Sequence, residues 1–163
     1  MRYRMRQKLL SWGNDFTIQD QDGNDVFFVD GKVFSIGDKL SFQDMDGTEL
    51  LFIEQKVFSW GPSYELQQGG SVVATVKKEL FTFFKDKFEV DIPGPNDYHV
   101  EGNIFDYEFT FTRTRGDLAA RVSKKFFSFS DSYGVDVVDG EDDLLILATA
   151  VIIDQVCHNS SNK

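Results

Sequence analysis

Short segments in which apolar and polar residues alternate make up most of this chain. An alternation with a period of two is typical of strands that have one buried face. About a dozen such segments can be counted, and no Gly/Pro/Ser-rich linker divides them. We therefore expect one mostly β-stranded domain over residues 1–163, with a turn at Pro93-Gly94-Pro95. Among the alternating apolar positions are Ile18, Val26, Phe28, Phe42, Leu50 and Phe52.

Glycines divide the alternating segments at regular intervals. Asp22-Gly23 and Asp46-Gly47 predict hairpins with type I′ turns, in which both central residues need a positive φ. A local repeat follows four of the glycines: a charged residue nine positions on, Phe at eleven, and Ser or Thr at twelve. The four glycines are Gly23, Gly47, Gly70 and Gly116.

The segment near the C-terminus breaks the alternation. Asp142 and Asp143 supply side chains that cap a helix, and residues 144–153 are then apolar on every face except for Thr149. A helix that is apolar all round is buried all round, so we expect a core helix over about 143–158. Its ten-residue apolar run is half of the roughly 20 residues that a membrane-spanning helix needs. The expected core residues are Leu144, Leu145, Ile146, Leu147, Val151, Ile152 and Ile153.

The number of strands and the apolar helix together predict the architecture. Eight strands make a barrel that its own side chains fill, whereas a barrel with more strands has room for an enclosed element. We therefore predict a mostly β fold, an antiparallel barrel of about twelve strands that encloses the C-terminal apolar helix.

Composition and charge narrow the class of function. A formal net charge of -10 and a pI near 4.6 argue against nucleic-acid binding, which requires a basic surface. Cys157 is the only cysteine, so the chain forms no intrachain disulfide and holds no cysteine-rich metal site. The first twelve residues contain four cations and no continuous apolar segment, which argues against a secretory signal. We expect a cytoplasmic protein.

Three segments resemble the LURP-one-related family. They are Tyr98-His-Val-Glu-Gly-Asn-Ile-Phe-Asp-Tyr, then Val122-Ser-Lys-Lys-Phe-Phe-Ser-Phe-Ser-Asp-Ser-Tyr-Gly-Val-Asp-Val, and the apolar run that ends at Asp154. The glycine-centred repeats at 23–35 and 47–59 are similar to the N-terminal half of that family. The resemblance implies a tubby-like fold, a twelve-stranded antiparallel barrel around a C-terminal helix that phospholipid scramblases share. It implies no established enzymatic activity. Tubby domains bind phosphoinositides through basic side chains, but those positions do not match residue by residue here.

The strongest candidate site is a row of cations at the N-terminus. Arg2, Arg4, Arg6 and Lys8 alternate with other residues, so in a strand all four side chains share one face. This face is an anion-binding or lipid-binding candidate. The alternative is a charged edge strand that discourages sheet-to-sheet aggregation.

Other candidate sites have simpler structural explanations. Closely spaced carboxylates such as Asp20 and Asp44 could approach a calcium ion, but Asp-Gly turns already account for them. His99 and His158 lack partners at metal-ligand spacing, and no Gly-x-Ser-x-Gly motif is present, so we expect no metal, cofactor or catalytic residue.

Asp154 is the ionisable residue that directly follows the apolar run of the helix. There it is expected near the barrel mouth, where a desolvated carboxylate requires a partner. It is either part of a structural plug or a functional acid.

Taken together, these patterns favour a non-catalytic binding or scaffold domain. Its target would be a phospholipid headgroup, a membrane surface or a protein partner. The alternative is a small-molecule-binding or enzymatic β-barrel, which an apolar helix in the centre disfavours, since the ligand would need the same space.

Overall fold

A computed structural model describes residues 1–7, 15–32, 39–58, 61–79, 85–103, 106–126 and 132–161. Within these residues the chain forms twelve strands, one α-helix and a short 3-10 helix, η1. The elements are β1 (Arg2–Gln7), β2 (Phe16–Gln19), β3 (Asp25–Lys32), β4 (Lys39–Asp44), β5 (Glu49–Phe58), β6 (Gly61–Gln68), β7 (Ser71–Lys78), β8 (Asp86–Asp91), β9 (Tyr98–Asn103), β10 (Glu108–Arg113), β11 (Leu118–Ser123), η1 (Lys124–Phe126), β12 (Ser132–Val137) and α1 (Asp143–Ser161).

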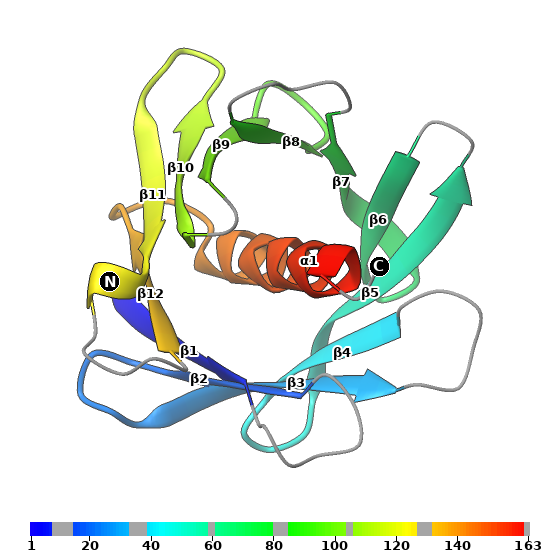
Figure 1. The fold of residues 1–163 in the computed structure, drawn as a ribbon. Helices are drawn as coiled ribbons and strands as arrows, with labels where there is room; N and C mark the ends of the chain where they lie inside the picture. Colours follow the sequence, from blue (N-terminus) through cyan, green and yellow to red (C-terminus); the bar gives the residue numbers. More distant parts are fainter. Residues whose placement is uncertain are drawn as a thin grey trace.

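The strands form one closed antiparallel barrel, and α1 runs through its middle (Figure 1). Each strand pairs with its neighbours in sequence, and β1 pairs with β12 to close the ring. The predicted fold class, a barrel of about twelve strands around a C-terminal helix, is confirmed. Because the connections alternate between the two ends, the turns that follow β2, β4, β6, β8, β10 and β12 lie together with the start of α1. We call this end of the barrel the turn end.

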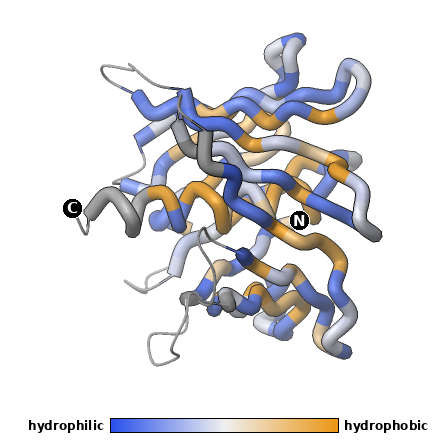
Figure 2. The backbone as a smooth tube through the Cα atoms, turned by 90° about the vertical axis from the view of Figure 1, so that its right-hand side faces the viewer, coloured by the Kyte–Doolittle hydropathy of each residue, from blue (hydrophilic) through white to orange (hydrophobic). Residues whose placement is uncertain are grey.

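The helix α1 begins at the expected residue and ends at Ser161, three residues beyond the expected end. Asp142 is its N-cap: its Oδ1 accepts a hydrogen bond from the Leu145 amide (3.2 Å), and its backbone oxygen accepts one from the Ile146 amide (3.1 Å). Figure 2 shows the hydrophobic residues of α1 running between the strands. No helix among the described residues is long and apolar enough to cross a membrane.

Six of the seven expected helix core residues are fully buried, and Leu144 is only partly buried. Leu144 lies in the first turn of α1, at the turn end of the barrel. The other six pack with inward-facing strand residues in a single core cluster.

The hairpins form where expected, but the Asp-Gly turns are not of type I′. Gly23 has a φ of +85°, whereas Asp22 does not have a positive φ. Asp20 Oδ1 accepts hydrogen bonds from the amides of Asp22 and Asn24, both at 2.9 Å, and these bonds favour a wider loop. The Asp44 carboxylate makes the same two bonds in the next hairpin. Two consecutive positive φ angles occur instead at Gly69-Gly70, between β6 and β7.

In β5 the inward-facing positions are Leu51 and Ile53, whereas Leu50 and Phe52 are only partly buried. The strand carries four consecutive apolar residues, so the sequence pattern did not determine which of them face the core. The turn at Pro93-Gly94-Pro95 forms as expected. The Phe and Ser or Thr positions that close each repeat lie outside the described residues or have side chains that are not described.

Candidate functional site

The strand β1 presents its arginines to the outside of the barrel. Tyr3 and Met5 are buried in the core, whereas Arg2 and Arg6 are exposed and Arg4 is half-buried. The expected alternation therefore places these three cations on one face. Lys8, the fourth predicted member of the row, lies outside the described residues.

The alternative interpretation of β1, a charged edge strand, is wrong. β1 pairs with β12 on one side and with β2 on the other, so both of its edges carry a ladder. The arginines of β1 therefore do not serve to protect an exposed sheet edge from aggregation, because a closed barrel has no such edge.

Arg2 belongs to a row of charges that crosses three strands. Its Nη2 lies 3.3 Å from Asp136 Oδ2 on β12, and its guanidinium lies 4.3 Å from the centroid of the Phe126 ring in η1. Asp136 is also the register partner of Arg121 on β11. One carboxylate therefore lies between two arginines on the outer wall.

The short helix η1 adds two more cations beside this row. Lys124 Nζ lies 4.3 Å from the centroid of the Tyr107 ring, and Lys125 Nζ lies 3.9 Å from Glu108 Oε1. Both lysines are exposed, and η1 packs against β12. We call the six residues of this surface the basic face: Arg2, Arg4, Arg6, Arg121, Lys124 and Lys125.

Sequence analysis found only half of the basic face. Arg121, Lys124 and Lys125 lie close together in the chain, which is a detectable signal. Their position beside β1 depends on the pairing of β1 with β12 and of β12 with β11. The same closure brings cations from residues 2–6 and from residues 121–125 onto one surface.

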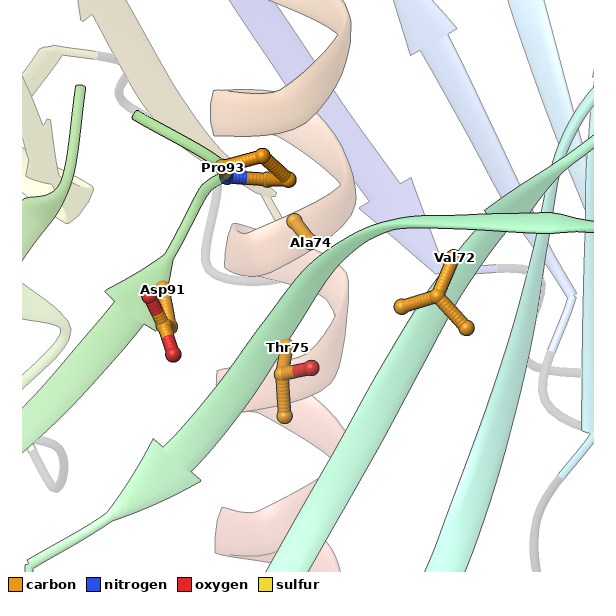
Figure 3. Close-up of a pocket in the computed structure, with 5 residues that line it drawn as sticks. All are labelled: Val72, Ala74, Thr75, Asp91 and Pro93. Carbon is orange, nitrogen blue, oxygen red and sulfur yellow. The ribbon is translucent and has the colours of Figure 1, made fainter. Parts of the chain in front are cut away.

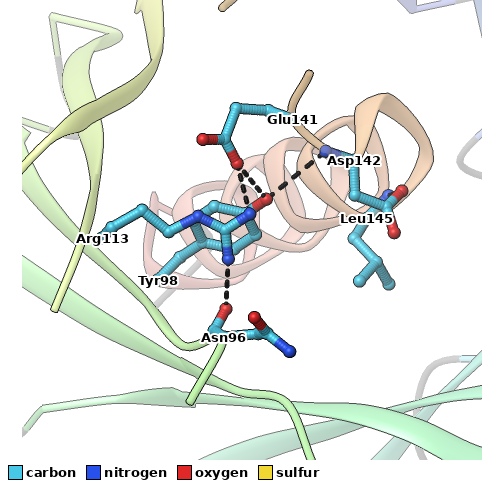
Figure 4. Close-up of polar contacts among 6 residues, drawn as sticks. All are labelled: Asn96, Tyr98, Arg113, Glu141, Asp142 and Leu145. Atoms are coloured by element: carbon cyan, nitrogen blue, oxygen red, sulfur yellow. Dashed lines mark hydrogen bonds and ion pairs between the residues drawn. The ribbon is translucent and has the colours of Figure 1, made fainter. Parts of the chain in front are cut away.

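A second polar group lies at the turn end, where α1 begins (Figure 4). Tyr98 donates its hydroxyl hydrogen to Glu141 Oε2 (2.8 Å) and accepts a hydrogen bond from the Asp142 amide (3.4 Å). Arg113 pairs with the same oxygen of Glu141, donates to the backbone oxygen of Asn96 (2.6 Å), and stacks at 4.2 Å from the centroid of the Tyr98 ring. We call Asn96, Tyr98, Arg113, Glu141 and Asp142 the helix clasp.

The helix clasp ties the first residues of α1 to β9 and β10, and a second contact ties them to β1. Tyr3 donates a hydrogen bond to Asp143 Oδ2. Burial, followed by the hydrogen bond to Glu141, raises the pKa of Tyr98 to about 12. Burial and the hydrogen bond to Asp143 also raise the pKa of Tyr3. Both phenols thus remain protonated donors, and the start of α1 is fixed from two sides of the barrel.

The remaining candidates do not gather into a metal-binding group among the described residues. His99 is a half-buried residue of β9, with Nδ1 2.5 Å from Glu89 Oε2 and Nε2 3.3 Å from Thr114 Oγ1. No cluster of three or more His, Cys, Asp or Glu in the described part of the chain could hold a metal ion. The side chains of Cys157 and His158 are not described.

Asp154 lies on α1 and is 3% exposed, next to the equally buried Gln155. Its side chain is therefore shielded from water, as that of Gln155 is. Its predicted role as an acid at the barrel mouth stays a prediction.

Comparisons with known proteins agree with this architecture. A family model described as LURP-one-related matches residues 1–154. The uncharacterized protein YxjI of Bacillus subtilis (strain 168) is 37% identical over 159 residues, which cover 98% of this chain and 95% of that protein. The X-ray structure of a protein from Arabidopsis thaliana matches with a TM-score of 0.70 over 95% of this chain and 91% of that one, at 21% identity. The structural likeness shows a shared tubby-like fold.

Proposed function

Because this chain belongs to the LURP-one-related family and folds as a tubby-like barrel, we propose that it is a non-catalytic domain that binds an anionic phospholipid surface. The proposal rests on one observation. Six cations from β1, β11 and η1 gather on one side of a molecule whose net charge is -10. Such segregation favours a local anion site over general attraction to anions.

The strength of binding follows from the number of cations. Each Lys or Arg beside an anionic leaflet contributes about 1 kcal/mol, so six give at most about 6 kcal/mol. That free energy corresponds to a dissociation constant of roughly 10⁻⁴ to 10⁻⁵ M. Asp136 and Glu108 pair with two of the cations and reduce this figure. We therefore expect weak, reversible binding.

The mode of binding is peripheral and electrostatic. The α-helix of the described chain lies inside the barrel, so it offers no amphipathic face for insertion into lipid. Charge attraction at a surface is screened over a Debye length of about 8 Å at physiological salt. Binding should therefore weaken as salt rises.

The packed centre supports a surface site over the rival small-molecule or enzymatic barrel. The side chains of Ile146, Val151 and Ile152 are fully buried against strand residues, in the space that an internal ligand would need.

The proposal places the domain in the cytoplasm, in keeping with a chain whose single cysteine allows no intrachain disulfide.

The test is co-sedimentation with vesicles of neutral phosphatidylcholine and with vesicles that also contain phosphatidylserine. We expect binding to the acidic vesicles alone, and its loss as salt rises. The triple variant Arg6→Gln, Arg121→Gln, Lys124→Gln should lose this binding. All three residues are exposed, so their replacement should leave folding unchanged.

A matched control makes the same change of charge elsewhere. Lys77, Lys87 and Arg115 are exposed and belong to β7, β8 and the turn after β10, so their replacement by Gln removes three charges from other surfaces. This control should bind like the parent protein. Equal loss in both triple variants, or binding that resists salt, would refute the basic face as the site.

A further inference from the structure

The wall of the barrel has an opening on the side opposite β1. β7 pairs with β6 as far as Ser71, but with β8 only as far as the pair Thr75 and Asp91. The segment Ser71–Ala74 therefore has a strand neighbour on one side alone. In the ring of twelve strands, β7 lies across the barrel from the basic face.

The sequence after β8 creates this opening. The Ile92 amide donates a hydrogen bond to Asp97 Oδ1 (2.8 Å), and Pro93 has no amide hydrogen to offer a ladder. Gly94, with a φ of +89°, then turns the chain toward β9. The end of β8 is thus fixed by local hydrogen bonding and by the proline-glycine turn.

The opening is a cavity of about 230 Å³ lined by Val72, Ala74, Thr75, Asp91 and Pro93. Figure 3 shows Asp91 at the end of β8 and Thr75 on β7, with α1 behind. Val72 is 48% exposed, so its apolar side chain can be contacted from outside. The volume is below the roughly 300 to 1,000 Å³ of sites for whole small ligands, so it suits a single side chain.

The charge of the lining indicates what kind of side chain fits. Asp91 is exposed, and no cation pairs with it among the described residues. Lys and Arg lay their apolar stems along surfaces such as Val72 and Pro93 while the charged head stays in water, and Asp91 lies within the same cavity.

We propose that this opening binds an extended, basic segment of a partner protein. The segment would add to β7 beside Ser71–Ala74 through backbone hydrogen bonds and place one Lys or Arg side chain against Asp91. Backbone pairing supplies affinity, and the carboxylate supplies the preference for a cation. The site is separate from the basic face, so the domain could hold a lipid surface and a basic partner at the same time.

The experiment uses the full chain, labelled with ¹⁵N, and the peptide acetyl-Thr-Val-Arg-Val-Thr-amide. We expect saturable shifts of the backbone amides of residues 71–75 and 91. Replacing the peptide's Arg with uncharged citrulline should weaken binding about two- to fivefold, because an ion pair with an exposed carboxylate adds only a modest attraction. A peptide with N-methylated backbone should also bind more weakly, since it cannot pair with β7.

Two variants complete the test. Asp91→Asn should weaken binding of the Arg peptide to the level of the citrulline peptide, whereas Asp46→Asn, which removes a charge elsewhere at the turn end, should leave it unchanged. Binding of Asp91→Asn to acidic vesicles should equal that of the parent, which separates this proposal from the lipid site.

Three results would overturn the proposal. The first is the absence of shifts at residues 71–75 at millimolar peptide. The second is equal affinity for the Arg and citrulline peptides, or for the N-methylated peptide, which would mean that a cation or the backbone is not recognised. The third is concentration-dependent dimerisation that competes with the peptide, which would assign the opening to a second copy of this chain.

Discussion

The helix clasp and the basic face use the same residue types for opposite purposes. In the clasp, Arg113 and Glu141 are 26% and 15% exposed, and each pairs with the other and with Tyr98. On the basic face, Arg2 and its partner Asp136 are 44% and 43% exposed. An ion pair with little contact with water is costly to break, whereas an exposed pair contributes almost nothing to stability. The half-buried pair of the clasp therefore stabilises the fold, whereas the pair on the basic face stays in contact with water.

The largest effect should follow from a change in the core that supports both regions. Ile146→Asp places a charge at a position that is 0% exposed, which costs several kcal/mol against a total stability of about 5 to 15. We expect loss of cooperative unfolding in circular dichroism. Val138→Asp, at an exposed apolar position between β12 and α1, is the control and should fold normally. A cooperatively unfolding Ile146→Asp variant would contradict the buried-helix arrangement.

The next change tests the comparison directly. Arg113→Gln leaves Glu141 half-buried without its cation and should lower the free energy of unfolding by about 2 kcal/mol. Arg2→Gln removes an exposed pair and should change it by less than about 1 kcal/mol. Urea unfolding of the two variants measures both values. Similar losses in the two would show that burial does not distinguish the regions.

A pH titration sharpens the comparison further. The pKa of Tyr98 is raised from 10.0 to about 12 in the folded protein, so the unfolded chain releases this proton first. The stability that Tyr98 contributes is therefore fully present below pH 10 and is lost as pH rises from about 10 to about 12. The fall of the free energy of unfolding with pH in this range should be less steep in Tyr98→Phe. It should be less steep again when Tyr3→Phe is added, because the pKa of Tyr3 is raised in the same direction. An unchanged slope in both variants would assign the alkaline transition to other groups.

The smallest effect concerns the exposed carboxylates of the turn end, which should not bind calcium. Asp20 Oδ1 already accepts two backbone amides, and hydrogen bonds from Asn24 lower the pKa of this carboxyl. A ligand that binds the folded protein must raise its melting temperature. We expect no change in melting temperature on addition of calcium. A rise that grows with calcium and is reversed by a chelator would restore the metal interpretation.

The elements of the fold could be predicted because their signals are local. Alternation defines strands, and Asp142 followed by an apolar run defines the start of α1. The phase of β5 could not be predicted, since Leu50, Leu51, Phe52 and Ile53 are all apolar and only packing selects two of them. The turn type at Asp22-Gly23 was missed because the side chain of Asp20 changes the loop.

The sites depend on contacts between distant parts of the chain. Tyr98, Arg113 and Glu141 come from β9, β10 and the segment before α1, and no spacing in the sequence links them. The basic face likewise needs strand order and closure before Lys124 lies beside β1. Sequence patterns could therefore indicate the arginine row of β1, but not the cations of β11 and η1 that lie beside it.

The pairing of β1 with β12 has a consequence for how the molecule forms during synthesis. Arg2 and Asp136, which pair across this seam, are separated by 134 positions. A chain leaving the ribosome presents Tyr3 and Met5 long before β12 and α1, which complete their surroundings, have been made. Contacts of such long range form slowly, because a long loop must close before they stabilise anything. The seam between β1 and β12 can therefore close only after almost the whole chain has been made.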